Sequence, residues 1–256
     1  MKLQPYIPLL IDFDGVLKIG DNPAHGIKEF LSFIIDKKIT ACILSNSTLK
    51  TGEDIKDFFY SNKIELTLPV MSAVDATLSF VKHNYKSISV YAVKRIREVF
   101  SEFLTDEDPD AVVVGDLGEK WTYEILNEIF RKVHNGAELV AMQKNKFWKP
   151  DGKTIALDAG AFISSIEFAT GKEAKLIGKP SSLFFQSALK ILGLSENSGF
   201  LMLGDDIETD IGAAQKSGGK GILIYTGKTK YPLPEDSKIK PDYSVKTLSD
   251  LINLFS

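Results

Sequence analysis

Short apolar runs alternate along this chain with segments whose apolar residues recur every three or four positions. The runs at residues 7–11 and 39–44 have the length and composition of buried β-strands. Between them, the apolar residues share one face of a helix: Ile27, Phe30, Leu31, Ile34 and Ile35. The opening of the chain therefore predicts a strand, a helix and a second strand.

The same alternation continues to the C-terminal part of the chain. Further strands are predicted at residues 88–93, 111–114, 139–142, 175–177, 200–203 and 222–225. Strands that alternate with helices indicate an α/β fold with a mostly parallel, doubly wound, Rossmann-like sheet. Ligands of such sheets bind beyond the carboxyl ends of the strands, so reactive residues should directly follow the apolar runs.

Two carboxylates follow the first predicted strand. Asp12 and Asp14 are one residue apart, and Gly15 permits a tight turn after them. Two like charges this close raise each other's pKa unless a cation neutralises one, which suits a site where one aspartate attacks and the other holds a proton. The alternatives are a solvated acidic turn or a calcium loop. The three residues after Gly15 are Val, Leu and Lys, and they lack the oxygen ligands of a calcium loop.

Uncharged and basic groups follow two other predicted strands. Ser45 and Asn46 can donate hydrogen bonds to phosphate oxygens without adding charge, although such pairs also form turns and helix caps. Lys179 stands between Gly and Pro directly after a strand, where its ammonium could balance phosphate and carboxylate charge. Its alternative is a solvated surface lysine.

Three aspartates lie within six residues after the predicted strand at 200–203. Asp205, Asp206 and Asp210 supply the oxygen ligands that hard cations prefer. The alternative is capping of a helix N-terminus, where aspartate is also favoured. Asp210 fits the capping role, whereas Asp205 and Asp206 come directly off the strand and fit it less naturally.

Composition narrows the classes of function. The chain has 256 residues, 44% hydrophobic and 25% charged, with a formal net charge of −3, so no global positive field would recruit nucleic acid or an anionic membrane. The single cysteine, Cys42, lies in an apolar run and is expected to be a buried structural thiol. Neither a signal peptide nor a membrane-spanning stretch is apparent, which predicts a soluble, cytoplasmic protein.

The four strand-end motifs occur in an order that resembles a known signature. DFDGV, a strand-terminal SN, GKP and GDDIETD resemble the four motifs of the haloacid dehalogenase (HAD) superfamily. The segments VVVGDLGEKWTYEILNEIF and LMLGDDIETDIGAAQKSGGKGILIYTGK look like subfamily IIA, which has a large cap between the second and third motifs. Within it, the chain resembles the branch of phospholysine phosphohistidine inorganic pyrophosphate phosphatase and the HAD-like hydrolase domain proteins.

Spacing indicates the same domain organisation. More than a hundred residues separate Asn46 from Lys179, which is more than the core needs. We expect a HAD catalytic core at residues 1–78 and 176–256 and an inserted α/β cap domain at residues 79–175.

The predicted cap contains candidates for contacts with the substrate. Residues 143–150 are basic and aromatic, unlike the Asn-x-Asp sequence of nucleotidase-like members, so a nucleotide or sugar-phosphate specificity is not carried over. Asp116, Lys146 and Trp148 are the candidate contacts, with packing inside the cap as the alternative for each, as it is for Trp121 and Tyr123.

The resemblance implies a mechanism. Asp12 would attack phosphorus, and Asp14 would protonate the leaving group and then deprotonate water. Phosphate would be held by Ser45, Asn46 and Lys179. Mg²⁺ would be bound by the Asp12 carboxylate, the Asp14 main-chain carbonyl and Asp205, with Asp206 and Asp210 completing or orienting this shell.

Several functions remain open at this point. The expected activity is hydrolysis of a phosphate monoester, phosphoramidate or pyrophosphate in a small phosphorylated substrate or, as a second choice, a phosphoprotein. The alternatives are a phosphotransferase or phosphomutase and a non-catalytic protein that binds a phosphorylated ligand. A homodimer is compatible with the resemblance.

Overall fold

The chain is divided into two compact units. The computed structural model describes residues 7–148 and 154–255. The first unit comprises Met1–Ser45, Gly52–Met71 and Lys179–Ser256, and the second comprises Asn46–Thr51 and Ser72–Gly178. The boundary expected near residue 79 falls inside helix α3 (Ala73–Asn84), whose residues all belong to the second unit.

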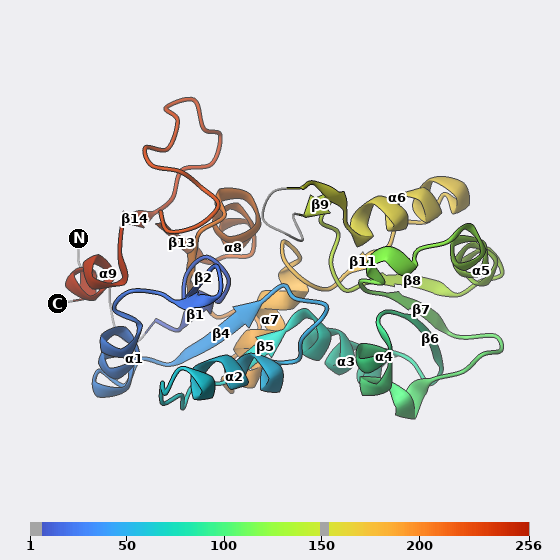
Figure 1. The fold of residues 1–256 in the computed structure, drawn as a ribbon, viewed down its shortest axis with the longest axis horizontal. Helices are drawn as coiled ribbons and strands as arrows, with labels where there is room; N and C mark the ends of the chain where they lie inside the picture. The colour runs from blue at the N-terminus through green and yellow to red at the C-terminus, as the bar shows by residue number, and fades with distance from the viewer. Residues whose placement is uncertain (1–6, 149–153, 256) are drawn as a thin grey trace. The chain divides into compact units, whose positions relative to one another are not determined.

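A six-stranded sheet forms the centre of the first unit. Its order is β14-β13-β12-β1-β4-β5, and the pairs of β1 with β4 and β12, of β12 with β13 and of β13 with β14 are parallel (Figure 1). The strands are β1 (Leu9–Asp12), β4 (Ala41–Ser45), β5 (Val70–Ser72), β12 (Leu201–Gly204), β13 (Lys220–Ile224) and β14 (Tyr243–Val245). The short β2 (Lys18–Ile19) and β3 (Asn22–Pro23) form a separate hairpin.

Helices cover this sheet because alternate strand residues are apolar on both faces. Leu9 and Ile11 pack in one cluster with α1 (Ile27–Asp36), α2 (Gly52–Ser61) and α9 (Leu248–Phe255). Leu10 is equally buried and faces the other side of the sheet. The remaining helices of the unit are α7 (Ser182–Ile191) and α8 (Ala213–Lys216), which pack on each other.

One residue of the helical face predicted for α1 is exposed and not buried. Ile27, Phe30, Leu31 and Ile34 are buried, but Ile35 is 46% exposed. A helix turns 100° per residue, so a fifth apolar position at the edge of the stripe lies beyond the part that the sheet covers.

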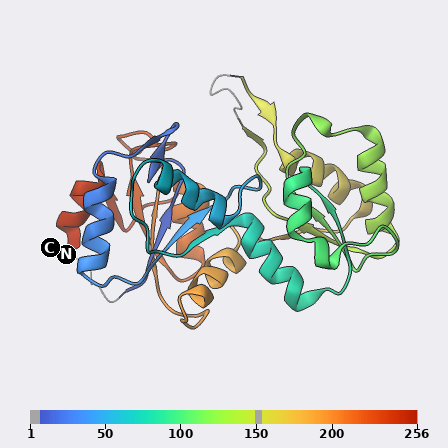
Figure 2. The same ribbon diagram turned by 60° about the horizontal axis from the view of Figure 1, so that its bottom comes forward.

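The second unit is a smaller α/β layer (Figure 2). Its parallel sheet has the order β11-β8-β7-β6. The strands are β6 (Ile88–Tyr91), β7 (Ala111–Val114), β8 (Glu138–Ala141) and β11 (Lys175–Leu176). Besides α3, its α-helices are α4 (Lys94–Val99), α5 (Tyr123–His134) and α6 (Ala159–Thr170), and an antiparallel hairpin pairs β9 (Phe147–Trp148) with β10 (Ala156–Leu157).

Local signals explain where helices of the second unit begin. The Ser72 side chain accepts a hydrogen bond from the Asp75 backbone N–H, and the Asp75 carboxylate accepts one from the Ser72 backbone N–H. This reciprocal capping box starts α3. The Thr122 hydroxyl caps α5, which then packs its apolar stripe with α6 on the sheet.

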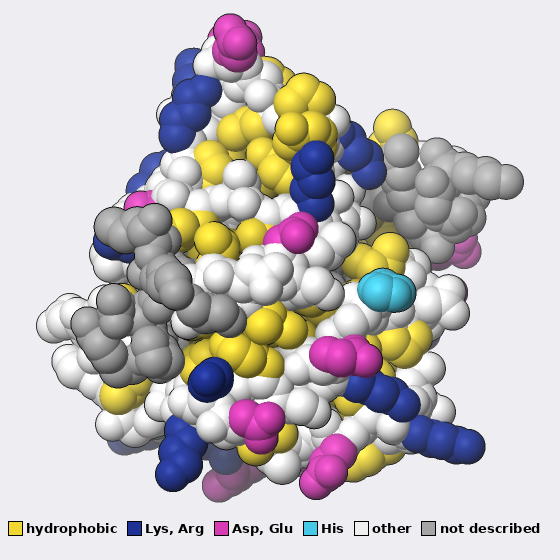
Figure 3. All heavy atoms as spheres, turned by 90° about the vertical axis from the view of Figure 1, so that its left-hand side faces the viewer, with side chains coloured by type: hydrophobic (Ala, Val, Ile, Leu, Met, Phe, Trp, Pro, Cys, Tyr) yellow, Lys and Arg dark blue, Asp and Glu magenta, His cyan; other side chains and the backbone are white. Residues whose placement is uncertain are grey.

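Within residues 7–148 and 154–255, no helix is both long enough and apolar enough to cross a bilayer. On the face drawn in Figure 3, Lys and Arg side chains are interspersed with Asp and Glu, and neither sign dominates.

Candidate active site

The candidate site lies at the carboxyl ends of three adjacent strands of the first unit. Asp12 ends β1, Ser45 ends β4, and Asp205 follows β12. The parallel register sets Asp12 beside Leu44 and Ile11 beside Leu203, so the polar residues after these positions meet at one sheet edge. This is the location expected from the alternation of strands and helices.

A buried lysine joins two of the aspartates. The Lys179 Nζ donates to Asp12 Oδ1 at 2.5 Å and to Asp210 Oδ1 at 2.6 Å. The exposed fractions are 4% for Lys179, 5% for Asp12 and 1% for Asp210. Lys179 is therefore a buried member of the site, and the alternative of a solvated surface lysine is wrong.

Burial and neighbouring charge shift the ionisation of this cluster. Burial raises the pKa of Asp12 well above its ordinary value, while the charge of Lys179 acts in the opposite direction. Burial would lower the pKa of Lys179, but the charges of Asp12 and Asp210 outweigh it and raise that pKa. We conclude that the lysine stays protonated and that burial disfavours the ionised form of Asp12.

Asp205 completes an acidic triad. One carboxylate oxygen each of Asp12, Asp205 and Asp210 lie within 4.8 Å of one another. Burial raises the pKa of Asp205 to about 6, against the opposing effect of a hydrogen bond from the Lys228 backbone N–H. If all three carboxylates are ionised, the single Lys179 ammonium leaves two negative charges uncompensated. Such an oxygen-only, doubly negative set fits a hard divalent cation.

The capping role falls to a different aspartate from the one the sequence suggested. Asp206, not Asp210, caps the helical turn at Ile207–Gly212, because its side chain accepts from the Glu208 and Thr209 backbone N–H groups. Burial works to raise the pKa of Asp206, but hydrogen bonds from Lys228 and from this turn hold it below the ordinary value. Asp210 instead points into the triad, where it also accepts from the Asp206 backbone N–H at 3.1 Å.

Asp14 differs from the triad in being open to solvent. Its side chain is 59% exposed, accepts from the Ser45 hydroxyl at 3.3 Å and lies 3.4 Å from the Lys18 ammonium. Ser45 itself is buried. The two aspartates of the DFDG motif thus occupy different environments, one enclosed beside a lysine and one exposed, as a nucleophile and a proton carrier require.

The other predicted residues lie in the second unit. Asn46 belongs to it, and a side chain at Gly178 would overlap the Asn46 amide oxygen, so these two residues are in close contact. Asp116 is buried and accepts from the Gly118 backbone N–H at 2.7 Å. Lys146 and Trp148 are exposed at the hairpin.

Further candidates of the second unit also have definite surroundings. Trp121 stacks on Phe162 with ring centroids 4.4 Å apart, whereas Tyr123 is 79% exposed. Packing inside the unit therefore accounts for Trp121 but not for Tyr123. Residues 149 and 150 of the basic–aromatic run lie outside the described residues.

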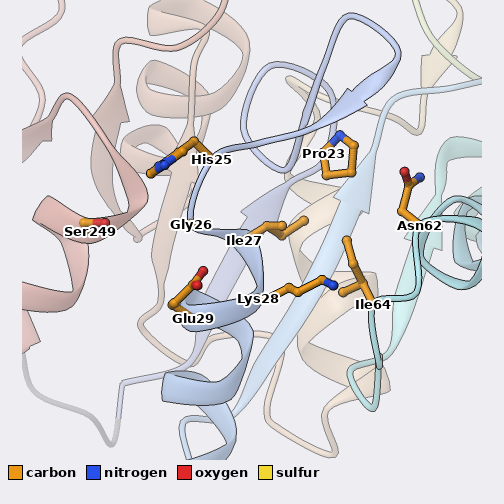
Figure 4. A pocket seen from close by; sticks show the side chains of 9 residues that line it. All are labelled: Pro23, His25, Gly26, Ile27, Lys28, Glu29, Asn62, Ile64 and Ser249. Carbon is orange, nitrogen blue, oxygen red and sulfur yellow. The ribbon is translucent and has the colours of Figure 1, made fainter.

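A hollow of about 500 Å³ lies near the start of α1, and none of Asp12, Asp205 and Asp210 lines it. Its lining includes Pro23, Ile27, Lys28, Glu29 and Ile64. Figure 4 shows the Lys28 and Glu29 side chains pointing in different directions from the first turn of the helix. Charges of both signs at its rim offer no concentrated complement for a phosphate, so the acidic cluster remains the candidate active site.

One segment of the site was not predicted from the sequence: residues 226–229, which follow β13. Thr226 contacts Gly15 after β1, and Lys228 contacts Asp205 and Asp206. Thr229 contacts Asp205 and Ile207. The available signal was a polar Thr-Gly-Lys-Thr run directly after a predicted strand, which is the same criterion that identified the other motifs.

Comparison with known proteins places these observations in a family. The family model described as haloacid dehalogenase-like hydrolase matches residues 9–104, and the model described as HAD-hydrolase-like matches residues 176–251. The haloacid dehalogenase-like hydrolase domain-containing protein 2 of Bos taurus is 32% identical over 235 residues, which are 91% of this chain and 88% of that protein.

Two further matches cover nearly the full length. The phospholysine phosphohistidine inorganic pyrophosphate phosphatase of Danio rerio is 28% identical, with coverage of 96% of this chain and 92% of that protein. The crystal structure of a 4-nitrophenylphosphatase from Thermotoga maritima superimposes with a TM-score of 0.87, at 24% identity and 98% coverage of both chains. At this identity the structural match supports the fold.

The fold and the site together define a Rossmann-like, parallel α/β core with an acidic centre and an inserted second α/β unit. This chain belongs to the haloacid dehalogenase-like hydrolase family. The expected placement in its large-cap subfamily IIA is confirmed, and the second unit corresponds to the cap.

Proposed function

We propose that this protein is a phosphatase that forms a phospho-aspartate on Asp12. The observation that carries the proposal is the buried cluster in which Lys179 binds both Asp12 and Asp210, with Asp205 beside them. The names of the relatives support phosphatase chemistry.

The charges of the site support a magnesium-dependent enzyme. A phosphate dianion would meet two uncompensated negative charges, so the site requires additional positive charge before substrate binds. The carboxylates of Asp12, Asp205 and Asp210 are the side chains that would hold Mg²⁺, and the Asp14 main-chain carbonyl remains a predicted ligand from the family resemblance. When bound, Mg²⁺ supplies the charge that lets phosphate approach Asp12.

Each polar residue of the site has its own role in the proposed reaction. An Asp12 carboxylate oxygen attacks phosphorus, an O–P bond forms, and the bond to the leaving group breaks while Asp14 donates a proton to the departing atom. Asp14 then takes a proton from water as its oxygen attacks phosphorus; the bond between phosphorus and the Asp12 oxygen breaks, inorganic phosphate leaves and the Asp12 carboxylate is restored. Lys179 holds the attacking carboxylate in place and offsets charge, and Ser45 donates to a phosphate oxygen.

The substrate is proposed only as a class. A small phosphate monoester, phosphoramidate or pyrophosphate matches the relatives' names, and a phosphoprotein is the second choice. We propose that Lys146 and Trp148 of the cap help to select the leaving group, because an exposed ammonium and an exposed indole are available on the hairpin. A role of the buried Asp116 in substrate contact stays a prediction. Cytoplasmic location and homodimerisation stay predictions.

The test is hydrolysis of p-nitrophenyl phosphate with and without Mg²⁺. Wild type should release p-nitrophenol only with Mg²⁺, and Asp12→Asn should reduce turnover to background because amide oxygen is a poor nucleophile. Asp36→Asn is the matched control, because it makes the same change at an exposed carboxylate at the end of α1. Equal turnover by wild type and Asp12→Asn would contradict the proposed nucleophile. A folded wild type inactive on this ester, pyrophosphate and phospholysine would refute phosphatase function.

A further inference from the structure

A four-residue segment that is far from Asp12 in the sequence contacts the acidic site. We name residues 226–229, which follow β13, the strap. Its sequence is Thr-Gly-Lys-Thr, and it contacts both the turn after β1 and the residues after β12.

Hydrogen bonds fix the strap at both places. The Thr226 hydroxyl donates to the Gly15 carbonyl at 2.5 Å across 211 positions of sequence. The Lys228 backbone N–H donates to Asp205 Oδ2 at 2.5 Å, and the Thr229 backbone N–H donates to the Asp205 carbonyl at 3.0 Å. Asp205 is therefore held by its main chain and by one of its two carboxylate oxygens.

Two glycines leave room for the Asp205 carboxylate. A Cβ at Gly227 would overlap Asp205 Oδ2 and approach Gly15 Cα to 3.0 Å. A Cβ at Gly15 would overlap the same carboxylate from the other motif, and Gly15 has a φ of +88° that side chains rarely adopt. The carboxylate therefore lies between two backbone segments and has little freedom to rotate.

Further contacts join the strap to the residues after Asp205. The Thr229 hydroxyl accepts from the Ile207 backbone N–H at 3.0 Å, and the Lys228 ammonium binds Asp206. The Lys228 side chain is 70% exposed, so its ion pair with Asp206 contributes little. The backbone contacts and the two threonine hydroxyls are the structural part of the strap.

We infer that the strap is a positioning element for the cation site. It fixes Asp205 Oδ2 through a backbone N–H, so that the remaining oxygen faces Asp12 and Asp210 in a single orientation. Thr226 and Gly227 are the positioning residues, because one ties the strap to the DFDG turn and the other admits the carboxylate. The inference rests on the proposed use of Asp205 as a cation ligand. Hydrogen-bonded partners of metal ligands typically change metal affinity about 10- to 100-fold when they are removed.

The test measures cation binding directly, apart from catalysis. Mg²⁺ affinity is determined by isothermal titration calorimetry for wild type, Thr226→Val, Thr226→Ser and Gly227→Ala. We expect Thr226→Val and Gly227→Ala to weaken binding about 10-fold or more. Thr226→Ser, which keeps the hydroxyl, should restore wild-type affinity. Gly199→Ala is the control, because a Cβ there meets no atom within 4 Å.

The outcomes separate this inference from the proposed function. Thermal unfolding without Mg²⁺ identifies variants that fail to fold. If Gly227→Ala fails to fold, the comparison of Thr226→Val with Thr226→Ser still tests the inference. Mg²⁺ affinity of Thr226→Val within twofold of wild type would overturn the inference, as would a wild type that binds no Mg²⁺. A wild type that binds Mg²⁺ through the strap but hydrolyses no phosphorylated compound would refute the proposed function and leave the inference intact.

Discussion

Replacing Lys179 by Met tests whether one ammonium holds the acidic cluster together. The substitution keeps an unbranched side chain of similar length but removes the charge and both hydrogen bonds, to Asp12 at 2.5 Å and to Asp210 at 2.6 Å. Three buried carboxylates would then have no cation among them. Removing one partner of a buried ion pair costs about 3 to 5 kcal/mol, because the other charge stays buried and uncompensated.

This loss should be visible in unfolding experiments. For a protein of this size we expect the midpoint of thermal unfolding in EDTA at pH 7.5 to fall by about 6 to 20 °C. Lys220→Met, at an exposed lysine on β13, is the matched control and should leave the midpoint nearly unchanged.

The effect should also depend on pH in a defined direction. Burial already raises the pKa of Asp12, and loss of the lysine removes the main opposing effect. A carboxyl group with a raised pKa in the folded state favours folding at low pH and opposes it as pH rises. The penalty of Lys179→Met should therefore be smaller at pH 4.5 than at pH 7.5. A midpoint within 2 °C of wild type at pH 7.5, or a penalty that grows on acidification, would refute the reasoning.

Two further substitutions test the proton carrier and a charge in the second unit. Asp14→Asn should lower kcat for a phosphate ester of an aliphatic alcohol about 100- to 10,000-fold, as loss of general acid–base catalysis does, because an alkoxide leaves only with a proton. Urea unfolding should stay at the wild-type midpoint because the Asp14 side chain is exposed. Unchanged kcat on this ester would exclude Asp14 as the proton carrier. Backbone N–H groups of Ser87 and Lys86 lower the pKa of Asp110 below its ordinary value of 3.8, so its charge stabilises the fold above that pH. The stability difference between wild type and Asp110→Asn should accordingly be present at pH 7 and be lost as pH falls below 3.8 through the lower pKa of the folded state. Urea titrations that give a constant difference would contradict this.

The fold was predictable where short-range patterns dominate. Apolar runs located β1, β4, β7, β8, β12 and β13 to within two residues at their starts or ends. The two-residue strands, such as β2 and β9, carry no periodicity, since alternation needs more than two positions to appear. The buried face of α1 was predicted correctly except at Ile35, where the width of the covering sheet decides exposure and the sequence alone does not show it.

Which residues form the site was easier to predict from the sequence than the role of each residue. Strand-end position and residue type identified Asp12, Lys179 and Asp205, which the structure brings together. The capping aspartate was misassigned because Asp206 and Asp210 are four residues apart, about one helical turn, and the sequence does not show which of them begins the turn at Ile207–Gly212. The strap follows a predicted strand and could have been identified as polar strand-end residues, but its contact from Thr226 to Gly15 spans 211 positions and is created only by the tertiary fold.

The surplus of negative charge links the stability of the site to its proposed chemistry. Three carboxylates around one ammonium are an unfavourable arrangement for a protein without a bound cation, since each added buried charge raises the free energy of the folded state. The same surplus favours binding of a divalent cation, because the cation is attracted to the carboxylates and also relieves the repulsion between them. A neutral cluster would fold more easily and bind Mg²⁺ more weakly. The strap and the Lys179 bridge are then understandable as restraints that keep the carboxylates close together despite their repulsion. Mg²⁺ should therefore raise the unfolding temperature of wild type more than that of Asp210→Asn, in which the surplus is one charge smaller.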